Sequence, residues 1–394
     1  MKKLLIIGAS ILQLPAIKKA KEMGFYVAVA DYDPNAVGIG YADEYFNVST
    51  IDIEGVSDVA ARFKPDGIMT LATDMPMRSI AAATKVCGLP GISMETAIKS
   101  TDKGEMIKAF KANGVEHPWF YILKSKEDLE TVIDNITFPC ISKPTDNSGS
   151  RGVMLINSKE ELKSAVEYSS SCGRGGSVIV EEYLSGNEVS VEIIVLSGTV
   201  HVLQVTDKIT TGAPHFVETG HTQPSRLPQD DVDAIKDLAA RAVKAVGIEN
   251  GPAHVEIMLT KNGPKMIELG ARMGGDCITT HLVPLSTGID MIKAVIQLSC
   301  GEAPDIAPKF NKGSAIRFID ANCGEITEIN GVEEAQNTEG VIEVSITKKV
   351  GDKTDCIKSS TDRTGFVIAQ GETADKASDL CEETQKKIII TLCK

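Results

Sequence analysis

The chain has 394 residues, of which 42% are hydrophobic and 24% are charged. This composition is typical of a folded globular protein and excludes a disordered or fibrous chain, and the length predicts roughly two to three domains. With 41 basic and 54 acidic residues, the formal net charge is −13, which is the opposite of what a general nucleic-acid binder presents.

The first hundred residues alternate apolar strand signals with helical spacing. Residues 3–7 form an apolar run that ends at Gly8, residues 15–20 have helical spacing, and residues 26–31 form a second run that ends at Asp31. The pattern recurs in residues 67–71 and 79–86, so residues 1–100 are predicted to form a doubly wound α/β domain. A dinucleotide site at Gly8 and Asp31, and with it a dehydrogenase, is disfavoured because the G-x-G-x-x-G glycines are missing.

A second region begins near residue 101. Residues 103–113 are helix-like, residues 138–143 and 153–156 are apolar strands, and residues 147–152 form a Gly/Ser-rich turn between them. Strand signals dominate residues 177–205 and 254–269, with an amphipathic helix predicted over 230–246. From residue 313 onward short strands and one helix at 373–387 indicate a small α+β cap.

The turn after Lys143 is the first candidate for chemistry. Lys143 ends an apolar strand and is followed by small side chains and the glycines Gly149 and Gly152. Such a loop lets backbone N–H groups approach phosphate oxygens while the lysine supplies positive charge. It is not a Walker A loop, because no G-K-[ST] occurs, and an ordinary Gly/Ser hairpin is the alternative.

Further along, the strand-like residues 180–192 contain four glutamates. Taken alone, they fit the solvated face of an edge strand.

The carboxylate pair Glu256 and Glu268 is the most informative feature. The strands 254–259 and 265–269 are joined by a turn at Asn262 and Gly263, and a hairpin would bring both glutamates to one face. Two convergent carboxylates suit a hard cation such as Mg²⁺ together with substrate phosphates, and oxygen ligands suit Mn²⁺ as well. Arg272 follows within reach, and its planar fork suits a phosphoryl oxygen. A cross-strand surface pair is the alternative.

The order and spacing of these features resemble the ATP-grasp superfamily of carboxylate–amine ligases. In chain order, the features are a lysine, a second lysine followed by a Gly-rich loop, an E-E-x-L segment with a later G-x-E, and finally an E…E-x-x-A-R segment. The resemblance implies a mixed α/β and α+β chain. It divides into an N-terminal α/β domain (1–100), an ATP-grasp domain (101–312) and the C-terminal cap (313–394). The central ATP clamp comprises a lid-bearing subdomain (101–180) and a metal and substrate subdomain (181–312).

The resemblance also implies a role for each matching residue. ATP and Mg²⁺, with Mn²⁺ as a substitute, would be the cofactors, Glu256 and Glu268 the metal ligands, and Lys143 and Arg272 the catalytic residues. The residues that would contact ATP are Lys103 and Lys143 at the phosphates, Ser148, Gly149, Ser150 and Gly152 in the lid, Glu181, Glu182 and Leu184 at the adenine, and Glu188 at the ribose.

One position departs from the family pattern, and two stretches resemble a narrower group within the family. Many members carry Asn two residues after the second metal glutamate, where this chain has Gly270. The E-x-G-A-R-x-G-G pattern of 268–275 and the segment 207–225 are similar to ligases that join amino acids. The implied substrate residues are Lys208, His215, Glu218, His221, Arg272 and Gly274. For the first four a solvent-exposed polar loop is the alternative, and a buried, satisfied histidine is the simpler interpretation of His254.

The cysteines and the apolar segments bear on location. No two of the nine cysteines have C-x-x-C spacing, so free thiols in a reducing cytosol are the simplest interpretation. The first 14 residues imitate a signal peptide, but Gly8 and Gln13 interrupt them, and no apolar run approaches the roughly 20 residues that span a bilayer. We expect a cytoplasmic protein with no nucleic-acid or membrane partner.

The sequence thus predicts an ATP-dependent ligase that activates a small-molecule carboxylate as an acyl phosphate and couples it to an amine. The resemblance also implies a homodimer. Two alternatives stay open at this point: a carboxylase or carbamoyl-phosphate-type enzyme that activates bicarbonate, and a non-catalytic nucleotide-binding protein of the same fold.

Overall fold

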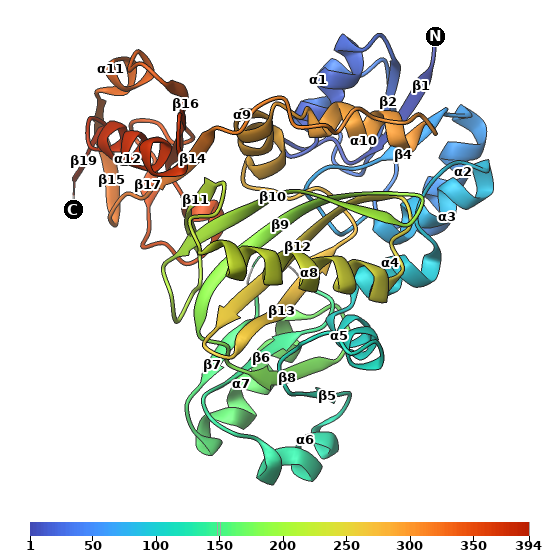
Figure 1. The fold of residues 1–394 in the computed structure, drawn as a ribbon, viewed down its shortest axis with the longest axis vertical. Coiled ribbons are helices and arrows are strands. Elements are labelled where there is room, and N and C mark those ends of the chain that lie inside the picture. Colours follow the sequence, from blue (N-terminus) through green and yellow to red (C-terminus); the bar gives the residue numbers. More distant parts are fainter. Residues whose placement is uncertain (148, 150, 394) are drawn as a thin grey trace.

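Four β-sheets organise the part of the chain that the computed structural model describes, which is residues 1–147, 149 and 151–393. Figure 1 shows the parallel N-terminal sheet at the upper right, the large sheet across the middle, the small sheet below it and the C-terminal segment at the upper left. The predicted fold class, a mixed α/β and α+β chain with a doubly wound N-terminal domain, is confirmed: the N-terminal sheet is parallel and the other sheets are antiparallel.

The N-terminal sheet has the strand order β3-β2-β1-β4, and every pair is parallel. Residues 4–7 of the central strand are fully buried, because helices cover both faces of a doubly wound sheet. The elements are β1 (Lys3–Ile7), α1 (Leu14–Glu22), β2 (Tyr26–Asp31), a 3₁₀ turn (Val37–Tyr41), β3 (Glu44–Asn47), α2 (Ile53–Phe63), β4 (Gly67–Met69) and α3 (Met77–Cys87).

The place where a dinucleotide would bind is filled by the protein itself. The Asp31 carboxylate accepts a hydrogen bond from the Ala9 backbone N–H at 2.7 Å. A Cβ on Gly8 would lie 2.9 Å from the side chain of Gln13, which is buried and donates to the Leu71 carbonyl. Asp31 therefore fixes a turn in the backbone.

The small sheet is antiparallel, with the order β5-β8-β6-β7. Its apolar face packs against α6 and α7 around Leu162 and Val180. The elements are α4 (Met94–Thr101), α5 (Lys103–Ala112), β5 (Phe120–Leu123), α6 (Lys126–Val132), a 3₁₀ turn (Ile133–Asn135), β6 (Cys140–Pro144), β7 (Met154–Ile156), α7 (Lys159–Cys172) and β8 (Val178–Glu182).

The large sheet has the order β13-β12-β9-β10-β11-β14-β18-β16. Its first part comprises β9 (Gly186–Leu196), β10 (Thr199–Thr210), β11 (Glu218–Gln223), α8 (Gln229–Val246), β12 (Gly251–Thr260), β13 (Gly263–Gly270), a π-helical turn (Ile278–Leu282), α9 (Val283–Thr287) and α10 (Met291–Ser299). Helix α8 covers β12 and β13 (Figure 1). Its buried residues, among them Ile235, Leu238 and Val246, recur at the spacing of one helix face, and each such large side chain contributes about 1.5–3 kcal/mol by burial.

The C-terminal segment continues the large sheet, since β14 pairs with β11. A helix, α12, packs on β14 and β18. The elements are β14 (Gly313–Ile319), β15 (Gly324–Asn330), α11 (Val332–Gln336), β16 (Val341–Ile346), β17 (Lys353–Thr354), a 3₁₀ turn (Ser360–Asp362), β18 (Gly365–Gly371), α12 (Ala374–Gln385) and β19 (Ile389–Cys393), with β17-β15-β19 as the fourth sheet. The sheet is thus continuous across the boundary expected at residue 313.

Two other segments cross the expected domain boundaries. Strand β8 belongs to the small sheet but runs two residues past position 180. Helix α10 lies within 181–312, yet it packs on α1 and β4 of the N-terminal domain (Figure 1), where Met291 and Ile296 join the buried core of the parallel sheet. The division into 1–100, 101–312 and 313–394 stays a prediction.

Among the described residues, no single helix is both long and apolar enough to cross a membrane. The helical segments 278–287 and 291–299 pass that test only as a pair, and they are bent by 113° relative to each other.

Candidate active site

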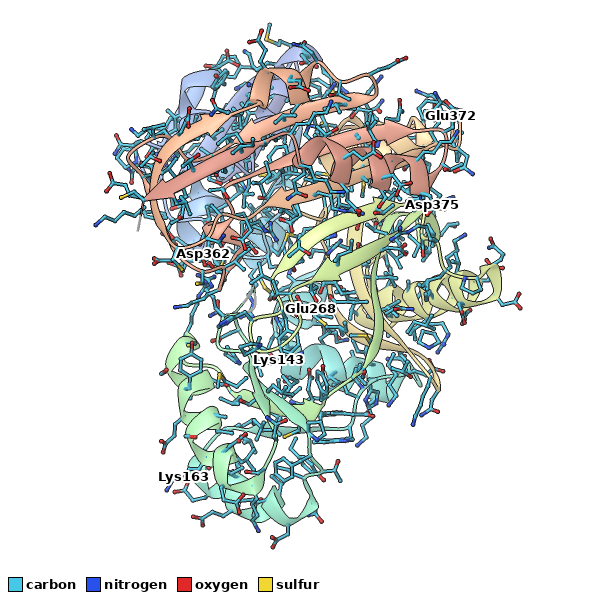
Figure 2. All side chains as sticks on the ribbon, turned by 90° about the vertical axis from the view of Figure 1, so that its left-hand side faces the viewer. Lys143, Lys163, Glu268, Asp362, Glu372 and Asp375 are labelled. Carbon is cyan, nitrogen blue, oxygen red and sulfur yellow. The ribbon has the colours of Figure 1, made fainter. Side chains whose placement is uncertain are left out.

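Two adjoining cavities lie where the small sheet, the large sheet and the N-terminal domain meet. The first, of about 160 Å³, is lined by side chains of β6, β8, β9, β10, β12 and β13. The second, of about 330 Å³, opens toward the N-terminal domain and shares Lys103, Asn147, Glu256 and Glu268 with the first. Figure 2 shows Lys143 and Glu268 at this junction, above helix α7, which carries Lys163.

Glu256 and Glu268 sit opposite each other on the β12–β13 hairpin, in direct register. The predicted hairpin is confirmed, and both carboxylates line both cavities. A bulge follows Glu256. Burial would raise the pKa of the Glu256 carboxyl, but Lys208 and His254 hold it well below its usual value, so Glu256 is an anion at neutral pH.

Two lysines, one on a helix and one on a strand, face carboxylates in the first cavity. Lys103, at the start of α5, lies 2.9 Å from a Glu268 oxygen and donates to the Asn147 carbonyl at 2.8 Å. Lys143, on β6, lies 2.5 Å from Glu181 at the end of β8. Because Lys143 and Glu181 are both buried, little solvent screens this ion pair.

The Gly-rich loop after β6 borders the same cavity. Gly149 and Gly152 have φ of +67° and +82°, a conformation that side chains disfavour. A Cβ on Gly152 would also lie 2.7 Å from the Cβ of Cys172. Ser148 and Ser150, which were expected in the lid, lie outside the described residues.

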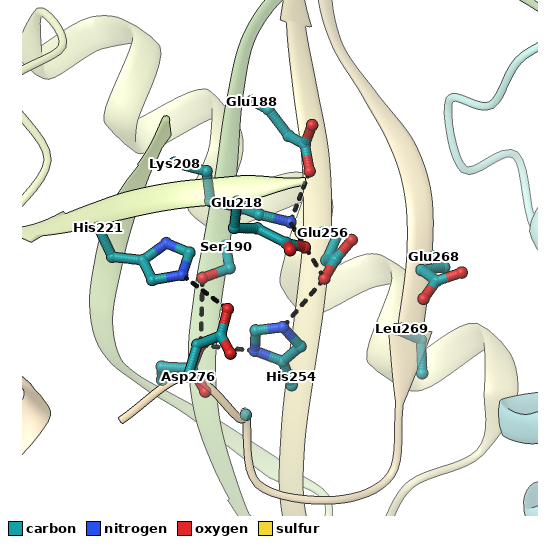
Figure 3. Close-up of polar contacts among 12 residues, drawn as sticks. Glu188, Ser190, Lys208, Glu218, His221, His254, Glu256, Glu268, Leu269 and Asp276 are labelled. Carbon is teal, nitrogen blue, oxygen red and sulfur yellow. Dashed lines mark hydrogen bonds and ion pairs between the residues drawn. The ribbon is translucent and has the colours of Figure 1, made fainter. Parts of the chain in front are cut away.

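Lys208 lies at the centre of the best-defined charge cluster. Its ammonium is 2.6 Å from Glu188, 3.3 Å from Glu256 and 3.8 Å from Glu218, and its side chain is only 4% exposed. Burial alone would lower the pKa of Lys208, but these carboxylates raise it well above its usual value. Figure 3 shows the contacts running from Glu188 through Lys208 and Glu256 to His254.

His254 connects this cluster to a fully buried glutamate. Its Nδ1 lies 2.6 Å from Glu192 and its Nε2 lies 3.2 Å from Glu256. Burial would lower the histidine pKa, yet the two carboxylates raise the pKa of His254 to about 9. His254 is therefore buried with a hydrogen-bond partner at each ring nitrogen, as the simpler interpretation of the sequence predicted. It also contacts Glu256, a candidate metal ligand.

This shift predicts a pH dependence of stability. The pKa of His254 in the folded protein, about 9, lies above its ordinary value of 6.5, so the protonated ring stabilises the fold fully below pH 6.5 and this contribution is lost as the pH rises through 9. Over that interval, the free energy of unfolding of the wild type should fall by about 3 kcal/mol more than that of His254→Gln. Urea unfolding of both proteins without divalent cations measures the difference, and parallel curves would refute it.

Arg272, just after β13, is held by a residue of the N-terminal domain. Its Nε and Nη2 donate to the two carboxylate oxygens of Asp74 at 3.0 and 3.1 Å. Burial disfavours the guanidinium charge, but Asp74, Glu256 and Glu268 raise the pKa of Arg272 above its usual value. Gly274 lies close by, where a Cβ would be 2.6 Å from His254 Nδ1 and 3.0 Å from Glu192, so no larger side chain fits there without displacement.

The remaining residues expected at the nucleotide line the first cavity. Glu182 also receives a hydrogen bond from Lys265 at 2.7 Å, and Leu184 follows Tyr183, whose ring centroid lies 6.3 Å from that of Phe216. An apolar wall therefore stands beside the Glu181–Glu182 segment.

The expected substrate segment forms two paired strands. Lys208 of β10 lies opposite His221 of β11, which is 1% exposed. Glu218 lines the first cavity, whereas His215 is exposed in the connecting turn. The solvent-exposed loop is therefore wrong for Lys208 and His221 and correct for His215.

A second charge cluster lies beside His221, and the sequence did not indicate it. His221 contacts Asp276 at 3.3 Å, and Arg363 of the C-terminal segment donates to Asp276 at 2.8 and 3.0 Å and to Glu218 at 3.0 Å. The Arg363 guanidinium also stacks on Phe318 at 3.7 Å. Burial would raise the pKa of the Asp276 carboxyl, but His221 and Arg363 lower it.

Asp74, Arg363 and Asp276 were missed for identifiable reasons. Asp74 follows a short parallel strand, and its position at the carboxyl end of that strand was the available signal. Asp276 directly follows the 268–275 pattern and so could have been noticed. Arg363 belongs to no motif, and it lies two residues before β18, which pairs with β14.

Comparison with known proteins gives the context of this geometry. An ATP-grasp domain model matches residues 136–280, and a model described as L-amino acid ligase C-terminal domain 2 matches residues 317–392. Alanine–anticapsin ligase of Bacillus subtilis is 27% identical over 316 residues, which are 74% of this chain and 66% of that protein. The chain thus spans about two thirds of that relative's length.

Two solved structures share the whole fold. L-amino acid ligase from Bacillus licheniformis aligns over 100% of this chain and 99% of its own, with a TM-score of 0.86 and 23% identity. Phosphoribosylglycinamide synthetase from Anaerococcus prevotii aligns over 100% of both chains, with a TM-score of 0.81 and 27% identity.

Proposed function

We propose that the chain, in which residues 136–280 match an ATP-grasp domain, is a carboxylate–amine ligase that joins the carboxyl group of an amino acid to the amine of a second amino acid or another small amine. ATP is converted to ADP and phosphate in the reaction. The observation that carries this proposal is the convergence of Lys103, Lys143, the pair Glu256 and Glu268, and Arg272 on two adjoining cavities. The match of residues 317–392 to an L-amino acid ligase domain supports amino acids as substrates.

The nucleotide occupies the first cavity in this proposal. Lys103 and Lys143 bind the phosphates, which compete with Glu268 and Glu181 for the two ammonium groups. Gly149 and Gly152 let the loop close over the phosphates as a lid, together with Ser148 and Ser150. Glu181, Glu182 and Leu184 face the adenine. Glu188, which pairs with Lys208 in the structure, binds the ribose hydroxyls in place of that lysine.

The residues fit a divalent cation. Glu256 and Glu268 present two carboxylates in register at the junction of the cavities, and Mg²⁺ is typically held by one or two carboxylates plus substrate phosphates. Gly270 adds no side-chain oxygen. Bound Mg²⁺, or Mn²⁺ in its place, would offset negative charge on the phosphoryl oxygens.

The reaction has two steps. A carboxylate oxygen of the first substrate attacks the γ-phosphorus as the bond to ADP breaks, and an acyl phosphate forms. The amine then attacks the acyl carbon, phosphate leaves, and the nitrogen loses a proton. Lys143 and Arg272 offset charge on the transferred group, while the closed lid keeps water from hydrolysing the acyl phosphate.

The substrates lie beside the transferred phosphate in this scheme. Lys208, Glu218 and His221 stand on the paired strands β10 and β11, and Arg272 and Gly274 follow β13. His215 contributes from the exposed turn when the loop closes. The proposal includes a cytoplasmic location, which the nine free cysteines support, and a homodimer.

The test is phosphate release from ATP and Mg²⁺ with pooled amino acids, each pool with and without bicarbonate, followed by mass spectrometry of the active pools. We expect release that requires two substrates and yields a product lighter than their sum by one water. Release with bicarbonate alone would favour a carboxylase, and ATP binding without turnover in every pool would favour a non-catalytic protein.

A further inference from the structure

Gly270 has no side chain because another residue occupies the space where one would project. A Cβ built on Gly270 would lie 2.6 Å from an Asp74 carboxylate oxygen and 3.1 Å from Arg272 Nε. Real Cβ atoms essentially never show contacts under 3.0 Å, so a side chain at position 270 would require the Asp74 carboxylate to shift. The backbone of Gly270 has no positive φ, so its conformation does not require glycine. The requirement is room for Asp74.

Asp74 reaches this point from the opposite part of the chain. It lies after β4 of the N-terminal sheet, 198 residues before Arg272. Both of its carboxylate oxygens are taken by the Arg272 guanidinium, in the paired geometry that fixes the plane of an arginine. Arg272 Nη1 donates to the Met273 carbonyl at 3.2 Å, so all three guanidinium nitrogens have a fixed direction.

The surroundings make this contact more than a surface ion pair. Asp74 and Arg272 both line the second cavity, which is also lined by Glu256 and Glu268. The side chains of Asp74 and Arg272 are only 22% and 14% exposed. The two glutamates also attract the guanidinium. Without Asp74, nothing among these contacts would hold the plane of the guanidinium, and the arginine would be free to pair with one of the two glutamates instead.

We propose that Asp74 is a positioning residue for Arg272 and that it takes the place of the side chain that position 270 lacks. The inference rests on the proposed function of Arg272 and adds a residue from a different domain to it. The N-terminal domain is then required for the chemical step itself, because it carries the group that aims the arginine.

A double-mutant cycle tests whether Asp74 acts through Arg272. Asp74→Asn keeps the shape and removes the charge, so kcat should fall about tenfold while the KM for ATP changes less than about twofold. In an Arg272→Lys background, the same substitution should lower kcat less than about twofold further. Asp58→Asn, an exposed aspartate on α2, is the matched control and should leave kcat unchanged. Effects of Asp74→Asn that multiply with those of Arg272→Lys would overturn the proposal.

A second arm needs no substrate. Gly270→Ala should lower the thermal unfolding midpoint by at least about 3 °C through the clash with Asp74, whereas the same substitution made in an Asp74→Gly background should lower the midpoint of that background by less than about 1 °C. Equal midpoints for Gly270→Ala and wild type would overturn the spatial claim. If the wild type forms no amide product, the proposed function fails, and the second arm still decides whether Asp74 fills the space beside Gly270.

Discussion

Glu268→Gln is expected to lower turnover by about 10²–10³-fold while leaving the fold intact. Glutamine keeps the size of the side chain but removes the negative charge that faces Lys103 at 2.9 Å and that the proposed cation site requires. Steady-state phosphate release with an active amino-acid pool measures the loss, and thermal unfolding checks the fold. Titration with Mn²⁺ should show weaker binding of the metal in the variant.

The matched control for this prediction is Glu105→Gln. Glu105 lies on α5, two residues after Lys103, and pairs with Lys108 at 2.7 Å. The side chains of Glu105 and Lys108 are each 47% exposed. Removing its charge should leave turnover within about twofold, because exposed ion pairs contribute little. Full activity of Glu268→Gln, or an equal loss in both variants, would remove Glu268 from the site.

Lys208→Met is expected to destabilise the protein by about 3 kcal/mol or more and to abolish turnover. The methionine has nearly the same shape, but it leaves Glu188, Glu218 and Glu256 facing one another without the ammonium that now holds them. Removing one partner of a buried charge cluster costs far more than removing an exposed ion pair. Urea unfolding at neutral pH measures the stability.

Lys265→Met provides the comparison, since Lys265 also pairs with a glutamate, Glu182 at 2.7 Å, but is 26% exposed. Its substitution should cost less than about 1 kcal/mol. A loss for Lys208→Met no larger than that for Lys265→Met would show that the three glutamates relax without the lysine, and the cluster would then not organise the site.

The local parts of the site could be predicted from the sequence because each motif lies within one structural unit. The strands around Glu256 and Glu268 are separated by a short turn, so alternation and turn chemistry were enough to pair them. The helix over 230–246 has a long, regular apolar face and appears as α8 within one residue.

Contacts between distant segments could not be predicted in this way. Periodicity reports which residues face a core, but it does not say which core, so the packing of α10 on the N-terminal sheet was missed. A solvent-exposed loop stayed open as the alternative for Lys208, because the three partners that bury its ammonium come from β9, β11 and β12. The Asp74–Arg272 and Asp276–Arg363 pairs depend on how the sheets assemble, and a single sequence carries no record of that.

The central claim, that a carboxylate is activated as an acyl phosphate, is tested most directly by oxygen transfer. An active amino-acid pool labelled with ¹⁸O in its carboxyl groups is incubated with ATP and Mg²⁺, and the released phosphate is analysed by mass spectrometry. The proposed mechanism predicts one ¹⁸O atom in each phosphate formed with product, because the attacking carboxylate oxygen leaves with phosphorus. Unlabelled phosphate accompanying amide product would contradict it.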